Sequence, residues 1–122
     1  MTKDQMIELL SERFSLIEEY DDGAIGLPLE IADRPITITI RHAAQILRFA
    51  CQLEPLAAMS DARLRTALEQ NRLLRRARFG ADDTHLIVRA DLPDRAATEP
   101  AFRDVTGHVM RTVALWWSGA SS

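Results

Sequence analysis

The chain has only one cysteine and no long apolar run. These two features argue against an internal disulfide and a membrane-spanning helix. With Cys51 as the only cysteine among 122 residues, no disulfide can form within the chain, which agrees with a reducing compartment. No stretch approaches the roughly 20 apolar residues that cross a bilayer, so we expect no membrane contact. The N-terminal segment is acidic and amphipathic, whereas a signal peptide begins basic and continues apolar. We therefore expect a cytoplasmic protein.

The residue spacings that mark common catalytic and metal sites are also missing. The histidines, His42, His85 and His108, fall on separate predicted elements without a partner one helical turn away or a nearby cluster of ligands. There is no glycine-rich phosphate loop, no Gly-x-Ser-x-Gly and no His-Glu-x-x-His. Cys51 lies on the apolar face of its predicted strand, where an inert thiol is expected. We predict no metal, no cofactor, no catalytic residue and no enzymatic activity.

Size and composition indicate one globular domain. A length of 122 residues is typical of a single domain, so 1–122 is predicted to be one unit. The apolar content of 47% is enough for a packed core without a metal or disulfide. The net charge of −3 hides a gradient, because residues 1–33 hold nine acids and two bases while residues 34–78 hold three acids and nine bases. An acidic first third therefore precedes a basic middle.

Hydrophobic periodicity predicts the secondary structure. Apolar residues recur at helical spacing in three segments and alternate with polar residues in five others. In chain order these are helix 3–20, strands 24–32, 36–40 and 47–53, helix 61–76, a short strand at Phe79, strand 86–92 and a helix from Thr98 to Trp117. For 47–53 a helix stays open, because good helix formers precede it.

The resulting order, α-β-β-β-α-β-β-α, predicts an α+β fold with an antiparallel sheet. Its strands are grouped rather than alternating with helices, which is typical of that class. One face of the sheet is expected to carry the helices. Pro28, within the first strand, cannot donate a ladder hydrogen bond, so this strand is predicted to lie at an edge or to carry a bulge.

Apolar residues on the first two strands are candidates for partner binding. Their apolar faces form one surface in the predicted sheet, made by Leu27, Leu29, Ile36 and Ile38. An extended peptide that adds as a strand at the edge could place alternate side chains in that surface. The alternative is that all four are core residues beneath the helices.

The basic middle and the paired tryptophans offer two further candidates. Arginines on and after the second helix could meet phosphates, but no aromatic ladder or helix-turn-helix pattern accompanies them, which disfavours nucleic acid. A solvated face, or one that pairs with the acidic first helix or a partner protein, is favoured instead. Trp116 and Trp117 point about 100° apart on a helix. If Trp116 enters the core, Trp117 either caps the core edge or belongs to an interface, where tryptophan is enriched.

The stretch from Asn71 to Pro93 resembles the YbjN-type bacterial sensory transduction regulator family and, more broadly, the type III secretion chaperone-like fold of the CesT group. The similar features are an Asn near the end of a helix, an Arg/Leu run, Phe79-Gly80, an acidic turn and the strand Leu86–Pro93. The resemblance implies a small, acidic, dimeric, non-enzymatic protein. In the secretion chaperones, dimers pair partly through the middle helix, and an extended effector segment wraps over apolar patches and sheet edges. The Arg-rich middle helix of this chain departs from that pattern.

Two classes of function follow from these observations. The first is a protein-binding module, chaperone-like or regulatory, that forms a homodimer and binds a protein partner of unknown identity through a sheet edge or apolar patch. Its candidate partner-binding residues are Leu27, Leu29, Ile36, Ile38, Arg72, Arg75, Arg76 and Trp117. The alternative is a small enzyme or ligand-binding protein whose pocket is not visible in the sequence.

Overall fold

The computed structural model describes residues 2–14, 17–74 and 76–119, and within them it contains three α-helices and one six-stranded antiparallel sheet. The elements in chain order are α1 (Lys3–Arg13), β1 (Glu18–Glu19), β2 (Ile25–Ile31), β3 (Arg34–Ala43), β4 (Ile46–Pro55), the 3₁₀ turn η1 (Leu56–Ala58), α2 (Asp61–Gln70), β5 (Arg78–Ala81), β6 (His85–Pro93), the 3₁₀ turn η2 (Asp94–Ala96) and α3 (Glu99–Gly119). None of the described helices is both long and apolar enough to cross a membrane.

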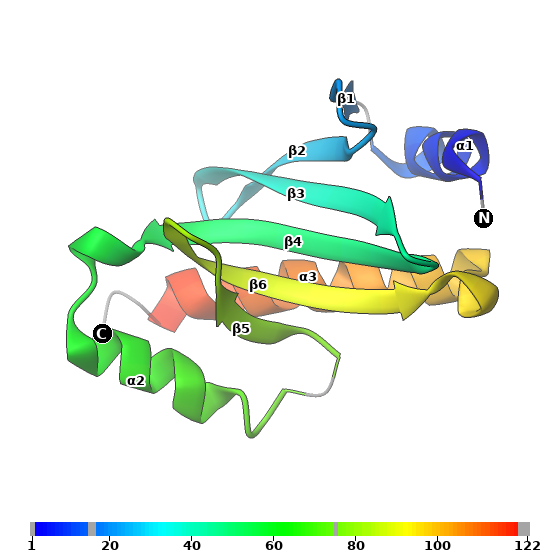
Figure 1. Ribbon diagram of the computed structural model, residues 1–122. Coiled ribbons are helices and arrows are strands. Elements are labelled where there is room, and N and C mark those ends of the chain that lie inside the picture. Colours follow the sequence, from blue (N-terminus) through cyan, green and yellow to red (C-terminus); the bar gives the residue numbers. More distant parts are fainter. Residues whose placement is uncertain (1, 15–16, 75, 120–122) are drawn as a thin grey trace.

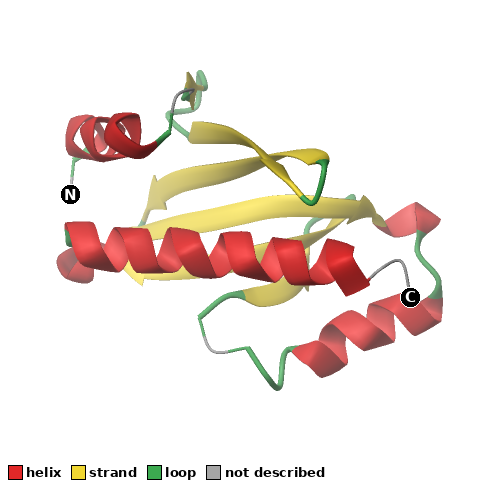
Figure 2. Cartoon of the chain, turned by 180° about the vertical axis from the view of Figure 1, so that it is seen from behind, coloured by secondary structure: helices red, strands yellow, loops and turns green. Residues whose placement is uncertain are grey.

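The strands lie in the order β1-β2-β3-β4-β6-β5, so the sheet begins as a meander and ends with a β5–β6 hairpin whose second strand pairs with β4. The predicted α+β class with an antiparallel sheet is confirmed. Helix α3 runs along one face of the sheet, and α2 lies beside β5 (Figures 1 and 2). The opposite face of the sheet is crossed by none of the described helices, as Figure 1 shows from that side.

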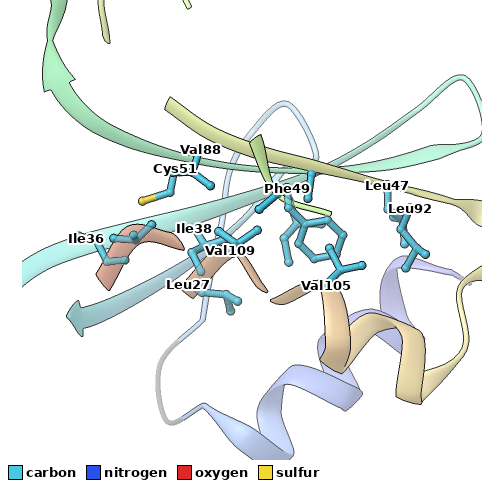
Figure 3. Packing of buried hydrophobic residues seen from close by; sticks show 14 of the residues in the cluster. Leu27, Ile36, Ile38, Leu47, Phe49, Cys51, Val88, Leu92, Val105 and Val109 are labelled. Atoms are coloured by element: carbon cyan, nitrogen blue, oxygen red, sulfur yellow. The ribbon is translucent and has the colours of Figure 1, made fainter. Parts of the chain in front are cut away.

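The core lies between α3 and the sheet face turned toward it. One row of side chains, in register across five strands, is at most 4% exposed: Leu27, Ile38, Cys51, Val88 and Phe79. Figure 3 shows the sheet side chains directed at Val105 and Val109 of α3. Phe49 meets Phe102 edge-on, with ring centroids 5.2 Å apart. Each large side chain buried in this way stabilises the fold by roughly 1.5–3 kcal/mol.

The segment 47–53, for which a helix was open, is part of strand β4. Leu47, Phe49 and Cys51 are buried while Arg48 and Gln52 are exposed, the alternation of a strand with one covered face. A helix would scatter these three apolar residues around its axis.

The helix predicted over 3–20 is wrong in its second half. Helix α1 ends at Arg13, and Glu18–Glu19 form β1 instead. Within the hairpin that follows, the Tyr20 N–H donates to the Ala24 carbonyl at 2.9 Å, and Gly23 takes the left-handed conformation at φ +87°. This local hairpin uses the residues that would have continued the helix.

Helix α2 also ends earlier than predicted, at Gln70 rather than residue 76. The next residue, Asn71, uses its side chain to bond the backbone of β5. A continuing helix would carry the chain away from that strand.

Two tight turns join β2 to β3 and β3 to β4 with strained backbones. Ala32 and Asp33 have φ of +52° and +62°, and Ala44 and Gln45 have φ of +52° and +65°. Two-residue hairpins require this left-handed region, which Gly and Asn occupy most readily. An alanine there costs about 1–2 kcal/mol.

Candidate functional site

The two edges of the sheet are treated differently, and the β5 edge is closed. The Asn71 side-chain amide donates to the Phe79 carbonyl at 3.0 Å, and the Phe79 N–H donates to Asn71 Oδ1 at 2.7 Å. The Asn71 side chain thus occupies the backbone of β5 as a neighbouring strand would. Ala67 of α2 is fully buried, so the helix covers the same side. Covering an edge in this way prevents its pairing with another chain.

The β2 edge is open over most of its length. Strand β1 pairs only with Ile25 and Gly26, at the start of β2. From Leu27 to Ile31, no strand of the described residues lies on the outer side of β2 (Figure 1). We call the space along this stretch the vacant lane. From Pro28 the sequence predicted an edge strand or a bulge; β2 is the second strand of the sheet, and its Pro28 stretch lies at an open edge because β1 is short.

The alternation of an antiparallel ladder fixes which backbone groups face the vacant lane. Because the Tyr20 N–H bonds the Ala24 carbonyl, Ala24 and every second residue after it turn their backbone polar groups outward. Gly26 is paired with β1, and Pro28 has no N–H. The vacant lane is therefore lined by the carbonyls of Pro28 and Glu30 and by a single N–H, that of Glu30.

The four apolar residues predicted on β2 and β3 do not form an open surface. Leu27 and Ile38 are 0% exposed and Ile36 is 8% exposed, so these three are core residues, the alternative left open by the sequence. Leu29 is half-buried and packs against the core from the edge, as does Ile31, which the sequence reasoning did not single out. Leu29 and Ile31 are the apolar side chains available beside the vacant lane. A role for the four in partner binding remains a prediction.

Trp117 lies at the end of the β2–β3 hairpin. The Arg34 guanidinium sits 3.8 Å from the centroid of the Trp117 ring, and Arg34 is in register with Ile31. Trp117 is half-buried, and its indole Nε1 is buried without a hydrogen-bond partner among the described residues. Trp116, by contrast, is 4% exposed and belongs to the core. Trp117 therefore caps the core edge close to one end of the vacant lane.

Two of the arginines predicted on and after the second helix, Arg63 and Arg76, hold elements together. Arg63 pairs with Glu54, whose Oε2 also accepts a 2.8 Å bond from the Trp116 indole. The Arg63 guanidinium lies 4.7 Å from the Trp116 ring. These contacts join β4, α2 and the end of α3.

The arginines predicted to bind a partner differ in their contacts. Arg76 Nε lies 3.1 Å from Asp104 of α3. Arg72 is exposed and makes no ion pair within the described part of the chain, and Arg75 lies outside the described residues. Arg76 is therefore engaged within the fold, whereas Arg72 is open to solvent.

The uncovered sheet face forms a wide hollow of about 850 Å³ that the sequence reasoning did not single out. Thr37, Thr39, Ala50 and Ile87 are half-buried in it. Of the arginines that line it, Arg48 lies 3.2 Å from Asp91 and Arg41 pairs with Asp22. The alternating polar residues of the strands were the available signal for this face.

A smaller apolar groove of about 300 Å³ lies between α1 and α3. Its walls include Leu10, Phe14, Phe102 and Met110, and the Glu99–Arg103 ion pair lies at its rim. Leu10 and Phe102 are buried, while Phe14 and Met110 are half-buried. The groove offers space for one apolar side chain or a small apolar ligand.

The buried thiol of Cys51 is not activated. Burial raises the pKa of the Cys51 thiol to about 11, so it stays protonated and is a poor nucleophile. In the described part of the chain, no three His, Cys, Asp or Glu side chains are placed to hold a metal ion.

Comparison with solved structures identifies the fold. A chain of the crystal structure of the ExsC–ExsE complex matches with a TM-score of 0.69 and 14% identity, covering 93% of this chain and 92% of that chain. A chain of the HopA1–SchA chaperone–effector complex matches with a TM-score of 0.64 and 16% identity, at the same coverage of 93% and 92%. The expected type III secretion chaperone-like fold is confirmed. No family model and no curated protein matches the sequence, so the resemblance to the YbjN type stays a prediction.

Proposed function

We propose that this protein is a non-enzymatic protein-binding module, chaperone-like or regulatory, that holds a partner segment as an added strand in the vacant lane beside β2. The observation that carries the proposal is the contrast between the two sheet edges. Asn71 closes the β5 edge, whereas Leu27–Ile31 pairs with β3 but with no described strand on its outer side. Folded proteins usually blunt such an edge, and strand addition is the recognition mode that uses it.

Two solved structures that share this fold are both of complexes, which supports a protein partner for this chain too. One is the ExsC–ExsE complex and the other is a chaperone–effector complex, HopA1–SchA. By analogy, the partner proposed here is a protein of unknown identity, met in the cytoplasm. The proposal includes a homodimer.

The backbone groups of the vacant lane cannot supply the whole affinity. The hydrogen bonds of Pro28 and Glu30 contribute roughly 0.5–1.5 kcal/mol each. Association loses about 4–15 kcal/mol of translational and rotational freedom. Apolar contact with Leu29, Ile31 and the exposed part of Trp117 is therefore part of the proposal.

The variant Glu30→Pro tests strand addition, because it removes the one N–H that faces the vacant lane. Glu30 is exposed, so the core is untouched. We expect this variant to keep its circular dichroism spectrum and to capture much less of the partner recovered from the native lysate. The control, Glu30→Gln, keeps the N–H and should retain capture. Equal capture by a folded Glu30→Pro variant contradicts the proposal.

A second candidate function is small-ligand binding in the groove between α1 and α3. Its volume of about 300 Å³ is at the lower limit of ordinary ligand pockets. A melting temperature raised by small apolar compounds would favour this alternative.

A further inference from the structure

Acidic side chains surround the vacant lane. Residues 17–33 contain six acids and no base: Glu18, Glu19, Asp21, Asp22, Glu30 and Asp33. Glu18 is paired with Gly26 and so ends the lane on one side, Glu30 lies along it, and Asp33 is in the turn at the other end. Two bases lie near these acids: Arg34, which is stacked on Trp117, and Arg41, which pairs with Asp22.

Two of these carboxylates face the same side of the sheet. Side chains alternate along a strand, so Gly26, Pro28 and Glu30 share the uncovered face. Glu18 is paired with Gly26 and has that orientation too. Glu18 and Glu30 are both exposed, and Glu30 makes no ion pair within the described part of the chain. The uncovered face of the lane is thus acidic at both ends.

The other face of the lane is apolar. Leu27, Leu29 and Ile31 alternate with the residues of the uncovered face and share the core face of β2, and Leu29 and Ile31 are half-buried and pack against the core. An added strand places alternate side chains beside these residues. Polar residues at those positions would be buried against apolar neighbours, which is unfavourable.

We infer that the occupant of the vacant lane is a short basic segment of a partner protein, in which apolar residues alternate with lysine or arginine. This inference rests on the proposed strand addition and specifies its partner. The apolar residues face α3 beside Leu29 and Ile31. The basic residues face the uncovered side, between Glu18 and Glu30, where opposite charges on neighbouring strands attract.

A second copy of this chain fits the lane poorly. Pairing two β2 edges about Glu30 would set like carboxylates opposite each other, which is destabilising. Pairing them about Leu29 would place Pro28 of each copy opposite Glu30 of the other, where the missing N–H leaves both Glu30 carbonyls unbonded. Charge and hydrogen bonding therefore both favour a different, basic partner.

Two labelled peptides of about eight residues test the inference, one alternating valine with lysine and the other valine with glutamate. Fluorescence anisotropy at low and physiological ionic strength measures their binding to the intact protein. We expect the lysine peptide to bind at least about fivefold more tightly, with a smaller difference at higher salt. Glu30→Lys should weaken the lysine peptide by about fivefold and strengthen the glutamate peptide. The matched reversal Asp83→Lys, in the exposed β5–β6 turn, should change neither.

The outcomes separate this inference from the proposed function. Equal binding of both peptides, or binding of neither, overturns the basic partner, while strand addition is still judged by partner capture with Glu30→Pro. If Glu30→Lys reverses the preference but Glu30→Pro leaves peptide binding unchanged, the peptides bind the acidic surface without adding a strand. That result overturns the inference and the proposed use of the lane together.

Discussion

At the scale of single residues, Asp82 in the β5–β6 turn has the most hydrogen bonds of any described carboxylate. It accepts from the Thr84 and His85 N–H groups at 2.8 and 2.7 Å, and from the Gln52 side chain at 3.1 Å. These bonds, the one from Gln52 foremost, lower the pKa of Asp82 to about 2. The ionised carboxylate thus ties the turn to β4.

We predict that Asp82 makes stability pH-dependent in acid. Its folded pKa of about 2 lies below the ordinary value of 3.8, so its contribution is present above about pH 4 and is lost as the pH falls toward 2. Asp82→Asn should flatten the fall in unfolding free energy across this window, measured by urea titration. The effect should be modest because the side chain is exposed. Asp83→Asn, one residue on, serves as the control; equal slopes for wild type and Asp82→Asn contradict the prediction.

At the scale of elements, Asn71 decides that the sheet has one vacant edge and not two. We predict that Asn71→Ala lowers the free energy of unfolding by about 1–3 kcal/mol, because the Phe79 N–H and carbonyl lose their partners. The exposed β5 edge should also promote aggregation, visible as increased light scattering. Asn71→Asp keeps an acceptor for the Phe79 N–H and should lie between. A variant as stable and monodisperse as wild type would show that Asn71 does not guard this edge.

The elements also mark how far the sequence alone could go. Alternation in β2, β3, β4 and β6 predicts these strands, since each has one covered face, and Pro28 predicts the edge because a missing N–H is a property of the residue itself. The ends of α1 and α2 could not be predicted in this way. They depend on the Tyr20–Ala24 hairpin and on Asn71 meeting Phe79, contacts that only the folded chain creates.

The candidate site was predictable only in part, because its burial and its ion pairs also depend on contacts that only the folded chain creates. Pro28 indicated an edge or a bulge from the sequence alone. The complete burial of Leu27 and Ile38, however, depends on where α3 lies. The pairing of Arg63 with Glu54 joins distant segments, so the sequence could not separate it from a free basic surface. The sequence left open whether Trp117 caps the core edge or belongs to an interface, since its contact with Arg34 forms only in the folded chain.

At the scale of the whole molecule, three leucines, in α2, in the turn after it and in α3, are largely exposed. Leu68 is 65% exposed, Leu73 83% and Leu115 51%. Figures 1 and 2 both place α2 beside the C-terminal end of α3.

We predict that exposed Leu68 of α2 supports the proposed homodimer. Burying Leu68 between two copies contributes about 1.5–3 kcal/mol per side chain. Leu68→Asp should therefore shift the protein toward a 13.7 kDa monomer in sedimentation at micromolar concentration. Ala62→Asp introduces the same charge at another exposed position of α2 and should leave the mass unchanged. A wild-type protein that sediments only as monomer contradicts the prediction.

The hairpin turns at Ala32-Asp33 and Ala44-Gln45 are strained, so substitutions that relieve the strain should stabilise the protein. Each holds an alanine in a backbone conformation better suited to asparagine, and each second position suits glycine. An Asn-Gly replacement at Ala44-Gln45, far along the chain from the vacant lane, would relieve strain without touching the edge. The added stability would offset the loss caused by a destabilising edge variant. That variant could then still be studied as a folded protein.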